Sequence, residues 1–184
     1  RGGPSGPPPP APPTHAPGAG HVRSTHPRPV RYEQPVYRLR DYVRLTPGAH
    51  HFPHGSVMLT IDDGPDPQWT PKILRLLEKH DVQATFCMIG SEVVGAPHLA
   101  RAVASQGHHL ANHSFTHPLS LPMLPLHRIR RELDDTQVAV VRATGVRPHL
   151  FRSPGGNWGA NLYHEIDIHG LVPLDWDIDP RDWA

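Results

Sequence analysis

The sequence predicts an α/β fold built on parallel strands. Short apolar runs typical of buried strands alternate with segments of helical periodicity, and the connections between them are short. The polar residues that could act in catalysis or bind a metal follow these strands, and α/β barrels build their active sites at the carboxyl ends of their strands. Right-handed crossovers between parallel strands allow either a barrel or an open sheet.

Five buried strands are expected, each from an apolar run bounded by turn residues. They cover residues 57–61, 84–89, 109–112, 150–151 and 171–176. The polar residues Asp62, His113, Arg152 and Asp175 lie at or just beyond the ends of four of these runs. Chance would place about half of such residues at the opposite ends, so this arrangement favours one shared site.

Four helices are expected between the strands, over residues 70–80, 97–106, 126–144 and 161–169. Thr70-Pro71 offers an N-cap followed by a proline at the first helical position. Gly145 and Gly170 follow the last apolar positions of the third and fourth helices, where glycine commonly ends a helix.

The amino-terminal part has a different composition from the rest. Residues 1–22 are mostly Pro, Gly and Ala, and such a stretch cannot bury enough apolar surface to offset its ordering entropy. We expect a disordered tether over residues 1–22, a transition segment over 23–55 and a domain over 56–184.

Composition also argues against several classes of function. The net charge is +1 and no basic stripe is visible, so a nucleic-acid partner is not expected. No run is long and apolar enough for a transmembrane segment, and no signal peptide is visible in this chain, which starts at Arg1. Cys87 is the single cysteine, which excludes an internal disulfide and favours a buried structural thiol.

Two segments contain candidate metal ligands. Asp62 and Asp63 are adjacent, and carboxylates on adjacent residues of an extended chain point to different sides, so one can bind a metal while the other remains a base. His113 and His117 are four residues apart and would share one face of a helical turn. Taken alone, the first segment also suits an ordinary turn, and the two histidines also suit an unliganded surface pair.

Four segments, in this order, resemble the motifs of the polysaccharide deacetylase family, also called the NodB homology domain or carbohydrate esterase family 4. They are Thr60-Ile61-Asp62-Asp63-Gly64-Pro65, His113-Ser114-Phe115-Thr116-His117-Pro118, Phe151-Arg152-Ser153-Pro154-Gly155-Gly156 and Trp176-Asp177-Ile178-Asp179-Pro180-Arg181-Asp182-Trp183. The resemblance covers roughly residues 56–184, and four ordered motifs make an accidental match improbable.

The resemblance implies a distorted (β/α) barrel and a divalent metal, zinc in the first place and cobalt as an alternative. It implies Asp63, His113 and His117 as metal ligands, Asp62 as the general base and Arg152 as the residue that orients it. The implied reaction is removal of acetyl groups from N-acetylglucosamine polymers such as peptidoglycan or chitin, or from xylan. The implied location is secreted or cell-wall associated.

The remaining expectations concern the substrate groove. The resemblance implies that Asp182 acts in catalysis on the leaving-group side together with Trp183, and Pro154, Gly155 and Trp158 are expected to contact substrate. The family often has an aromatic residue where this chain has Gly155, which predicts a wider groove wall at that position. The fifth motif of the family, with the histidine that would protonate the departing amine, does not occur before Ala184, so we expect a barrel that is incomplete at its C-terminus.

Two other functions remain open from the sequence. The missing terminal acid would also suit a non-catalytic glycan- or cell-wall-binding domain. Two histidines and one carboxylate would also suit a non-haem iron oxygenase, although a free Asp62 beside Asp63 favours hydrolysis.

Overall fold

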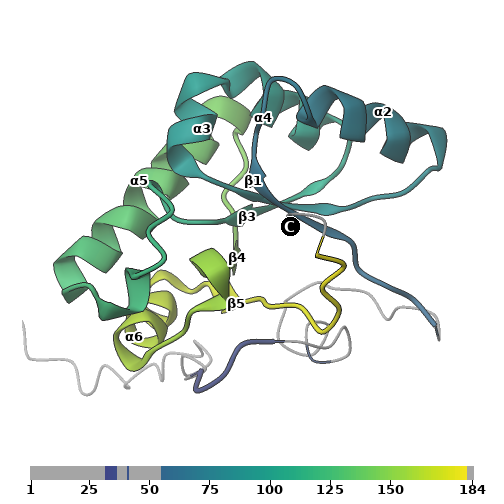
Figure 1. Ribbon diagram of the computed structural model, residues 1–184. Helices are drawn as coiled ribbons and strands as arrows, with labels where there is room; N and C mark the ends of the chain where they lie inside the picture. The colour runs from purple at the N-terminus through teal and green to yellow at the C-terminus, as the bar shows by residue number, and fades with distance from the viewer. Residues whose placement is uncertain (1–31, 37–40, 42–54, 182–184) are drawn as a thin grey trace, which may run out of the picture.

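The computed structural model describes residues 32–36, 41 and 55–181, and it shows one parallel sheet with helices along it (Figure 1). The sheet order is β1-β2-β3-β4-β5, with every neighbouring pair parallel. Its strands are β1 (Thr60–Gly64), β2 (Thr85–Met88), β3 (His109–Asn112), β4 (Leu150–Phe151) and β5 (Val172–Pro173). The α/β class and the parallel sheet predicted from the sequence are confirmed.

Five α-helices and two short 3₁₀ helices connect the strands. They are α2 (Thr70–Lys79), α3 (Gly90–Gly95), α4 (Pro97–Ser105), η1 (Leu121–Met123), α5 (Leu126–Thr144), η2 (Pro154–Gly156) and α6 (Ala160–His169). Figure 1 shows α2, α3 and α4 together on one side, with α5 beside them and α6 at the other end of the sheet. None of the described helices combines the length and apolarity needed to cross a lipid bilayer.

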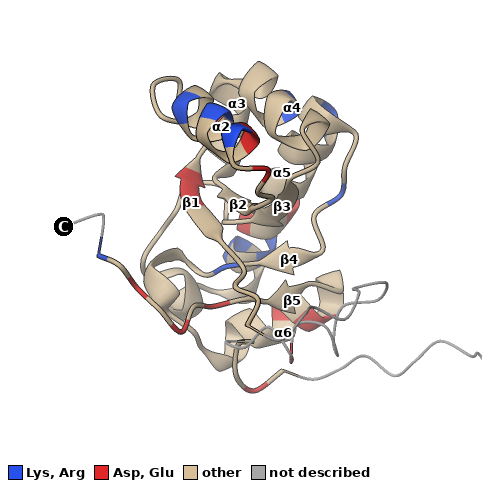
Figure 2. Cartoon of the chain, turned by 90° about the vertical axis from the view of Figure 1, so that its right-hand side faces the viewer, with Lys and Arg blue, Asp and Glu red and all other residues tan. Residues whose placement is uncertain are grey.

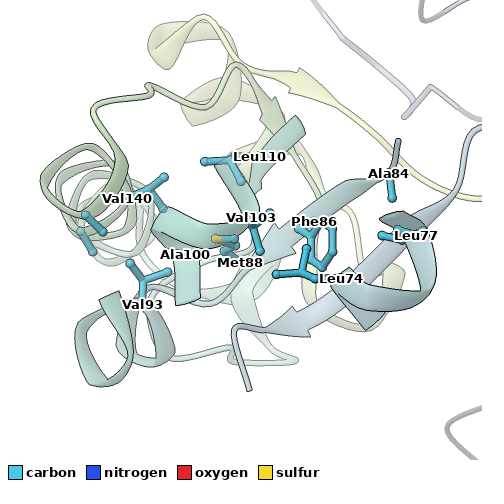
Figure 3. Packing of buried hydrophobic residues seen from close by; sticks show 12 residues of the cluster. Leu74, Leu77, Ala84, Phe86, Met88, Val93, Ala100, Val103, Leu110 and Val140 are labelled. Atoms are coloured by element: carbon cyan, nitrogen blue, oxygen red, sulfur yellow. The ribbon is translucent and has the colours of Figure 1, made fainter. Parts of the chain in front are cut away.

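The outer face of the sheet packs against the helices. Phe86, Met88 and Leu110 point toward α2, α4 and α5 and are almost completely buried among them (Figure 3). On β4, Phe151 packs under α5 and α6 in the same way. Burial of one such side chain stabilises the fold by about 1.5–3 kcal/mol, so this layer holds the sheet in place.

The inner face of the sheet is lined by the alternate residues. Cys87, Ala111, Leu150 and Val172 point away from the helices and form a second cluster. Cys87 is completely buried and free, as predicted. Strand residues alternate between faces, so the residues two positions further toward the carboxyl ends of the strands also face this side. The candidate site lies there.

The segment before the predicted domain boundary contributes to this inner face. Val36 is 4% exposed and forms a parallel bridge with Leu174, beside β5. The disordered tether predicted over 1–22 and most of the transition segment lie outside the described residues. The domain boundaries therefore stay predictions.

Three local expectations were wrong. The first strand begins at Thr60 rather than at Val57, which is 82% exposed, so Asp62 and Asp63 belong to the strand instead of following it. Helix α3 was not expected, since its sequence Gly90–Gly95 has two glycines and two valines in six residues. Thr70 is the first residue of α2 rather than its cap, and the Asp66 carboxylate accepts the free amide of Trp69 instead.

Candidate metal centre and catalytic residues

The acidic end of β1 forms one side of the site, and it is drawn red in Figure 2. Alternation along β1 directs Thr60 and Asp62 to the inner face, while Ile61 packs on the helix side. Asp63 departs from the strand conformation with a φ of +66°, and the β1–β2 register shifts between Ile61 and Gly64. Simple alternation would direct the Asp63 carboxylate to the helix side; with this left-handed backbone it lies beside His113 and His117 instead.

Arg152 lies under the site and fixes Asp62. Its side chain is 2% exposed, and Nη1 donates to the Asp62 carboxylate over 2.9 Å and to the Thr60 hydroxyl over 2.7 Å. The other donors of the guanidinium reach the main-chain oxygens of Leu174 and Asp175. A buried guanidinium whose three nitrogens all donate hydrogen bonds holds the Asp62 carboxylate in one rotamer. The Asp62 side chain remains 32% exposed.

Asp63 faces two imidazoles. Its Oδ1 lies 3.3 Å from Nε2 of His113 and 3.2 Å from Nε2 of His117, and its side chain is 65% exposed. The hydrogen bond with His113 holds the pKa of Asp63 below its usual value, against the effect of burial. Burial, with the charge of His113 next, lowers the pKa of His117. These shifts favour a carboxylate at Asp63 and a neutral ring at His117, which are the forms that bind metals.

The donor atoms suit a divalent cation. One ligand atom from each of Asp63, His113 and His117 lies within 4.8 Å of the other two. Donors about 2.0–2.2 Å from a tetrahedral zinc ion are about 3.3–3.6 Å apart, close to the two oxygen–nitrogen separations found here. Two imidazoles and one carboxylate form a three-residue set that leaves a position open for water or substrate.

His113 is supported from behind. Its ring is 3% exposed, and its Nδ1 lies 2.8 Å from the carbonyl oxygen of Arg152. Donation from Nδ1 to that carbonyl orients the ring so that Nε2 could bind a cation in place of its contact with Asp63, the arrangement usual for a metal-binding histidine. Arg152 thus supports the candidate base Asp62 through its side chain and the candidate metal ligand His113 through its main chain.

The segment that joins the two histidines is not the helical turn expected from their spacing. Residues 113–117 form an irregular loop, with Ser114 and His117 at φ values of +61° and +56°. The Ser114 hydroxyl accepts the amide of His117 over 3.2 Å. The histidines meet because the loop reverses direction, and their ring centroids are 4.8 Å apart.

Of the predicted substrate contacts, Gly155 and Trp158 differ in character. Gly155 is exposed at φ +62°, and a Cβ there would lie 3.1 Å from the Leu119 side chain. Trp158 stacks on Tyr163 at 5.5 Å and donates from Nε1 to Asp175 over 2.7 Å, so one ring face is already occupied. Burial raises the pKa of Asp175 above its usual range.

Of the remaining predicted residues of the groove, only Pro154 lies in the part of the chain that the structure describes. Pro154 is buried at the start of η2, directly after Ser153. Asp182 and Trp183 lie outside the described residues. Their roles, and those of all the site residues, stay predictions.

The sequence does not single out the residues that support the site from a distance. Thr60 was not singled out, although it shares the Arg152 donor with Asp62. Glu132 of α5 was also missed, although it accepts hydrogen bonds from the loop between the histidines. No sequence signal marks Glu132, because its partners are 16 and 17 residues away.

Comparison with known proteins agrees with the motif resemblance. The family model described as polysaccharide deacetylase matches residues 49–173. A chitooligosaccharide deacetylase of Rhizobium leguminosarum bv. trifolii is 41% identical over 131 residues, which are 70% of this chain and 60% of that protein. A peptidoglycan-N-acetylglucosamine deacetylase of Bacillus cereus is 33% identical over 128 residues, 70% of this chain and 46% of that protein.

Solved structures give the same result for the fold. A family 4 carbohydrate esterase from Streptomyces lividans, solved in complex with acetate, superposes with a TM-score of 0.68 at 37% identity. The match covers 71% of this chain and 67% of that one. The matched part of this chain corresponds to about half to two thirds of each of these proteins.

Proposed function

The chain belongs to the polysaccharide deacetylase family, and we propose that it is a metal-dependent hydrolase that removes acetyl groups from a polysaccharide. N-acetylglucosamine polymers are the first choice of substrate, because relatives are named for chitooligosaccharides and for peptidoglycan. Acetylated xylan is the second choice. Action on such polymers suits a secreted or cell-wall-associated protein.

One observation supports this function above the others: the adjacent carboxylates Asp62 and Asp63 face different partners. Asp63 lies against His113 and His117, whereas Asp62 is held by Arg152 with its side chain one-third exposed. A hydrolase that uses a metal and a separate base needs this division.

We assign the metal to Asp63, His113 and His117, with zinc as the first choice and cobalt as the second. Such a cation, when bound, polarises an acyl oxygen and lowers the pKa of water toward about 7. The protein's own contribution is to hold a base beside the reacting water. Asp62 takes a proton from that water as it attacks the acetyl carbonyl, and Arg152 keeps the carboxylate in the rotamer that reaches it.

The proposal is tested by the release of acetate. The substrates are N-acetylglucosamine oligomers, peptidoglycan and acetylated xylan, each with the protein as isolated, after chelation and after return of zinc. We expect release from an N-acetylglucosamine substrate that stops on chelation and returns with zinc. Release that continues unchanged after chelation would contradict the proposal.

The same assay separates the alternatives. A non-catalytic glycan-binding domain would bind metal and glycan without releasing acetate from any of the three substrates. A non-haem iron oxygenase would need iron and oxygen, so zinc-supported acetate release under anaerobic conditions would exclude it.

A further inference from the structure

Glu132 stands out among the residues that do not face the site. It is half-buried on α5, and both of its carboxylate oxygens are directed at the loop between His113 and His117. Oε2 accepts the amides of Phe115 and Thr116 over 2.7 and 2.8 Å, and Oε1 accepts the Thr116 hydroxyl over 2.7 Å. These distances are typical of strong, charge-assisted hydrogen bonds.

The loop depends on side chains for all four of its successive amides. The amide of Ser114 donates to Asn112 Oδ1 over 3.0 Å, the next two donate to Glu132, and that of His117 donates to the Ser114 hydroxyl. Regular secondary structure would satisfy these groups with main-chain oxygens. Here Glu132 is the single anionic acceptor and the one that takes two amides.

The opposite side of the loop is also fixed. The carbonyl oxygens of Ser114 and Phe115 accept the amides of Gly90 and Ser91, at the start of α3, over 3.0 Å each. The loop is therefore held between α3 and α5, with Glu132 closing the α5 side. This arrangement stabilises the two left-handed residues, Ser114 and His117, that ordinary loops avoid.

The two histidines differ in how far they depend on this loop. His113 follows β3 directly, and its ring is buried against the Arg152 carbonyl. The ring of His117 is 27% exposed, and within the described ranges it shows no hydrogen bond to a supporting group behind it. The position of His117 is therefore set mainly by its backbone.

We propose that Glu132 is the positioning residue that places His117 in the metal site, through the amides of Phe115 and Thr116. This inference rests on the proposed metal site. Residues that orient metal ligands typically change metal affinity about 10- to 100-fold when they are replaced.

The test measures zinc affinity by competition with a chromophoric chelator. Glu132→Leu removes every acceptor and should weaken zinc binding about 10- to 100-fold. Glu132→Gln keeps one carbonyl oxygen for the two amides but loses the charge, and it should weaken zinc binding about 3- to 10-fold. Thr116→Val removes only the hydroxyl contact, so zinc affinity should change by less than about 3-fold.

A control and a second readout separate positioning from general stability. Asp135→Asn removes another carboxylate of α5, one that pairs with Arg131 at 3.4 Å and does not bond the loop, and it should leave zinc affinity unchanged. At saturating zinc, Glu132→Gln should recover its kcat with an unchanged KM for the glycan. A purely structural residue would lower the thermal midpoint without this recovery.

The outcomes distinguish the two proposals. If the wild type binds zinc and both Glu132 variants bind it equally well, the positioning role is wrong and the proposed function stands. If Glu132→Leu does not fold, Glu132→Gln decides, and an unchanged affinity overturns the inference. If the wild type binds no zinc, both proposals fall together.

Discussion

Arg152 and Asp62 are 90 residues apart in the sequence, yet Nη1 of one lies 2.9 Å from Oδ1 of the other. Asp63, the next residue, lies against two histidines instead. One arginine thus separates the tasks of two neighbouring carboxylates.

Arg152→Lys should lower kcat without weakening zinc binding. A lysine keeps the positive charge but cannot reach Thr60, Asp62 and the two main-chain oxygens at once. Since a misplaced base costs on the order of 100-fold, we expect a loss of about 10- to 100-fold in acetate release. Arg130→Lys is the matched control, because Arg130 makes a two-bond pair with Glu165 away from the site. Equal losses in both variants would contradict the assignment.

Substitution of the two adjacent aspartates should change different quantities. Asp62→Asn should lower kcat by about 10²- to 10⁴-fold, the usual contribution of a general base, and leave zinc affinity within about 3-fold of wild type. Asp63→Asn should mainly weaken zinc binding, because it removes the charged ligand. Zinc titration and acetate release on both variants decide the matter. The interpretation is wrong if both substitutions change the same quantity.

His108 should make the fold sensitive to acid. Burial, with the charge of His109 next, lowers its pKa, and its Nδ1 accepts the amide of Ala84 over 3.4 Å in the neutral form. In the unfolded chain His108 takes up a proton near pH 6.5, whereas in the folded chain it does so only at a lower pH. The free energy of unfolding should therefore fall as the pH drops below about 6.5, by up to about 1.4 kcal/mol per pH unit.

This slope can be measured by urea unfolding between pH 5 and 8. His108→Gln should make the decline shallower, since glutamine can still accept the amide and does not titrate. His98→Gln, on the exposed face of α4, should leave the slope unchanged. An identical slope in all three proteins would show that His108 is not responsible.

Gly156→Ala should destabilise the protein more than Gly170→Ala. Both glycines have similar φ values, +65° and +63°, so both substitutions carry a left-handed cost of about 1–2 kcal/mol. A Cβ at Gly156 would also lie 2.7 Å from the ring of Trp176, whereas nothing lies within 4 Å at Gly170. We expect an additional cost of about 1–3 kcal/mol for Gly156→Ala.

The same substitution should affect catalysis. The ring of Trp176 lies 5.4 Å from the guanidinium of Arg152, so a displaced Trp176 disturbs the group that holds Asp62. Acetate release should fall in Gly156→Ala and stay unchanged in Gly170→Ala. Equal unfolding free energies for the two variants would show that the ring moves aside without cost.

The elements best predicted from the sequence were those specified by local signals. Helix α5 has a long apolar periodicity and ends at Gly145, whose left-handed φ of +75° favours glycine. Helix α6 ends in the same way at Gly170. The gathering of polar residues at the carboxyl ends of the strands was also predictable, because it follows from parallel topology.

The elements that were missed depend on contacts distant in the sequence. Helix α3 has poor helical propensity, but its first amides bind the carbonyls of the histidine loop. That loop looked helical from the spacing of His113 and His117, and it is instead shaped by Glu132 of α5. The turn of Asp63 away from the strand depends on a register shift that no local pattern marks.

Anomalous diffraction at the zinc edge, from crystals of the zinc-loaded protein, would locate the metal and its ligands in one experiment. We expect a single peak about 2.0–2.2 Å from Asp63 and from Nε2 of His113 and His117, with Asp62 bonded to Arg152 and not to the metal. A peak elsewhere, or one that includes Asp62 among its ligands, would contradict this expectation.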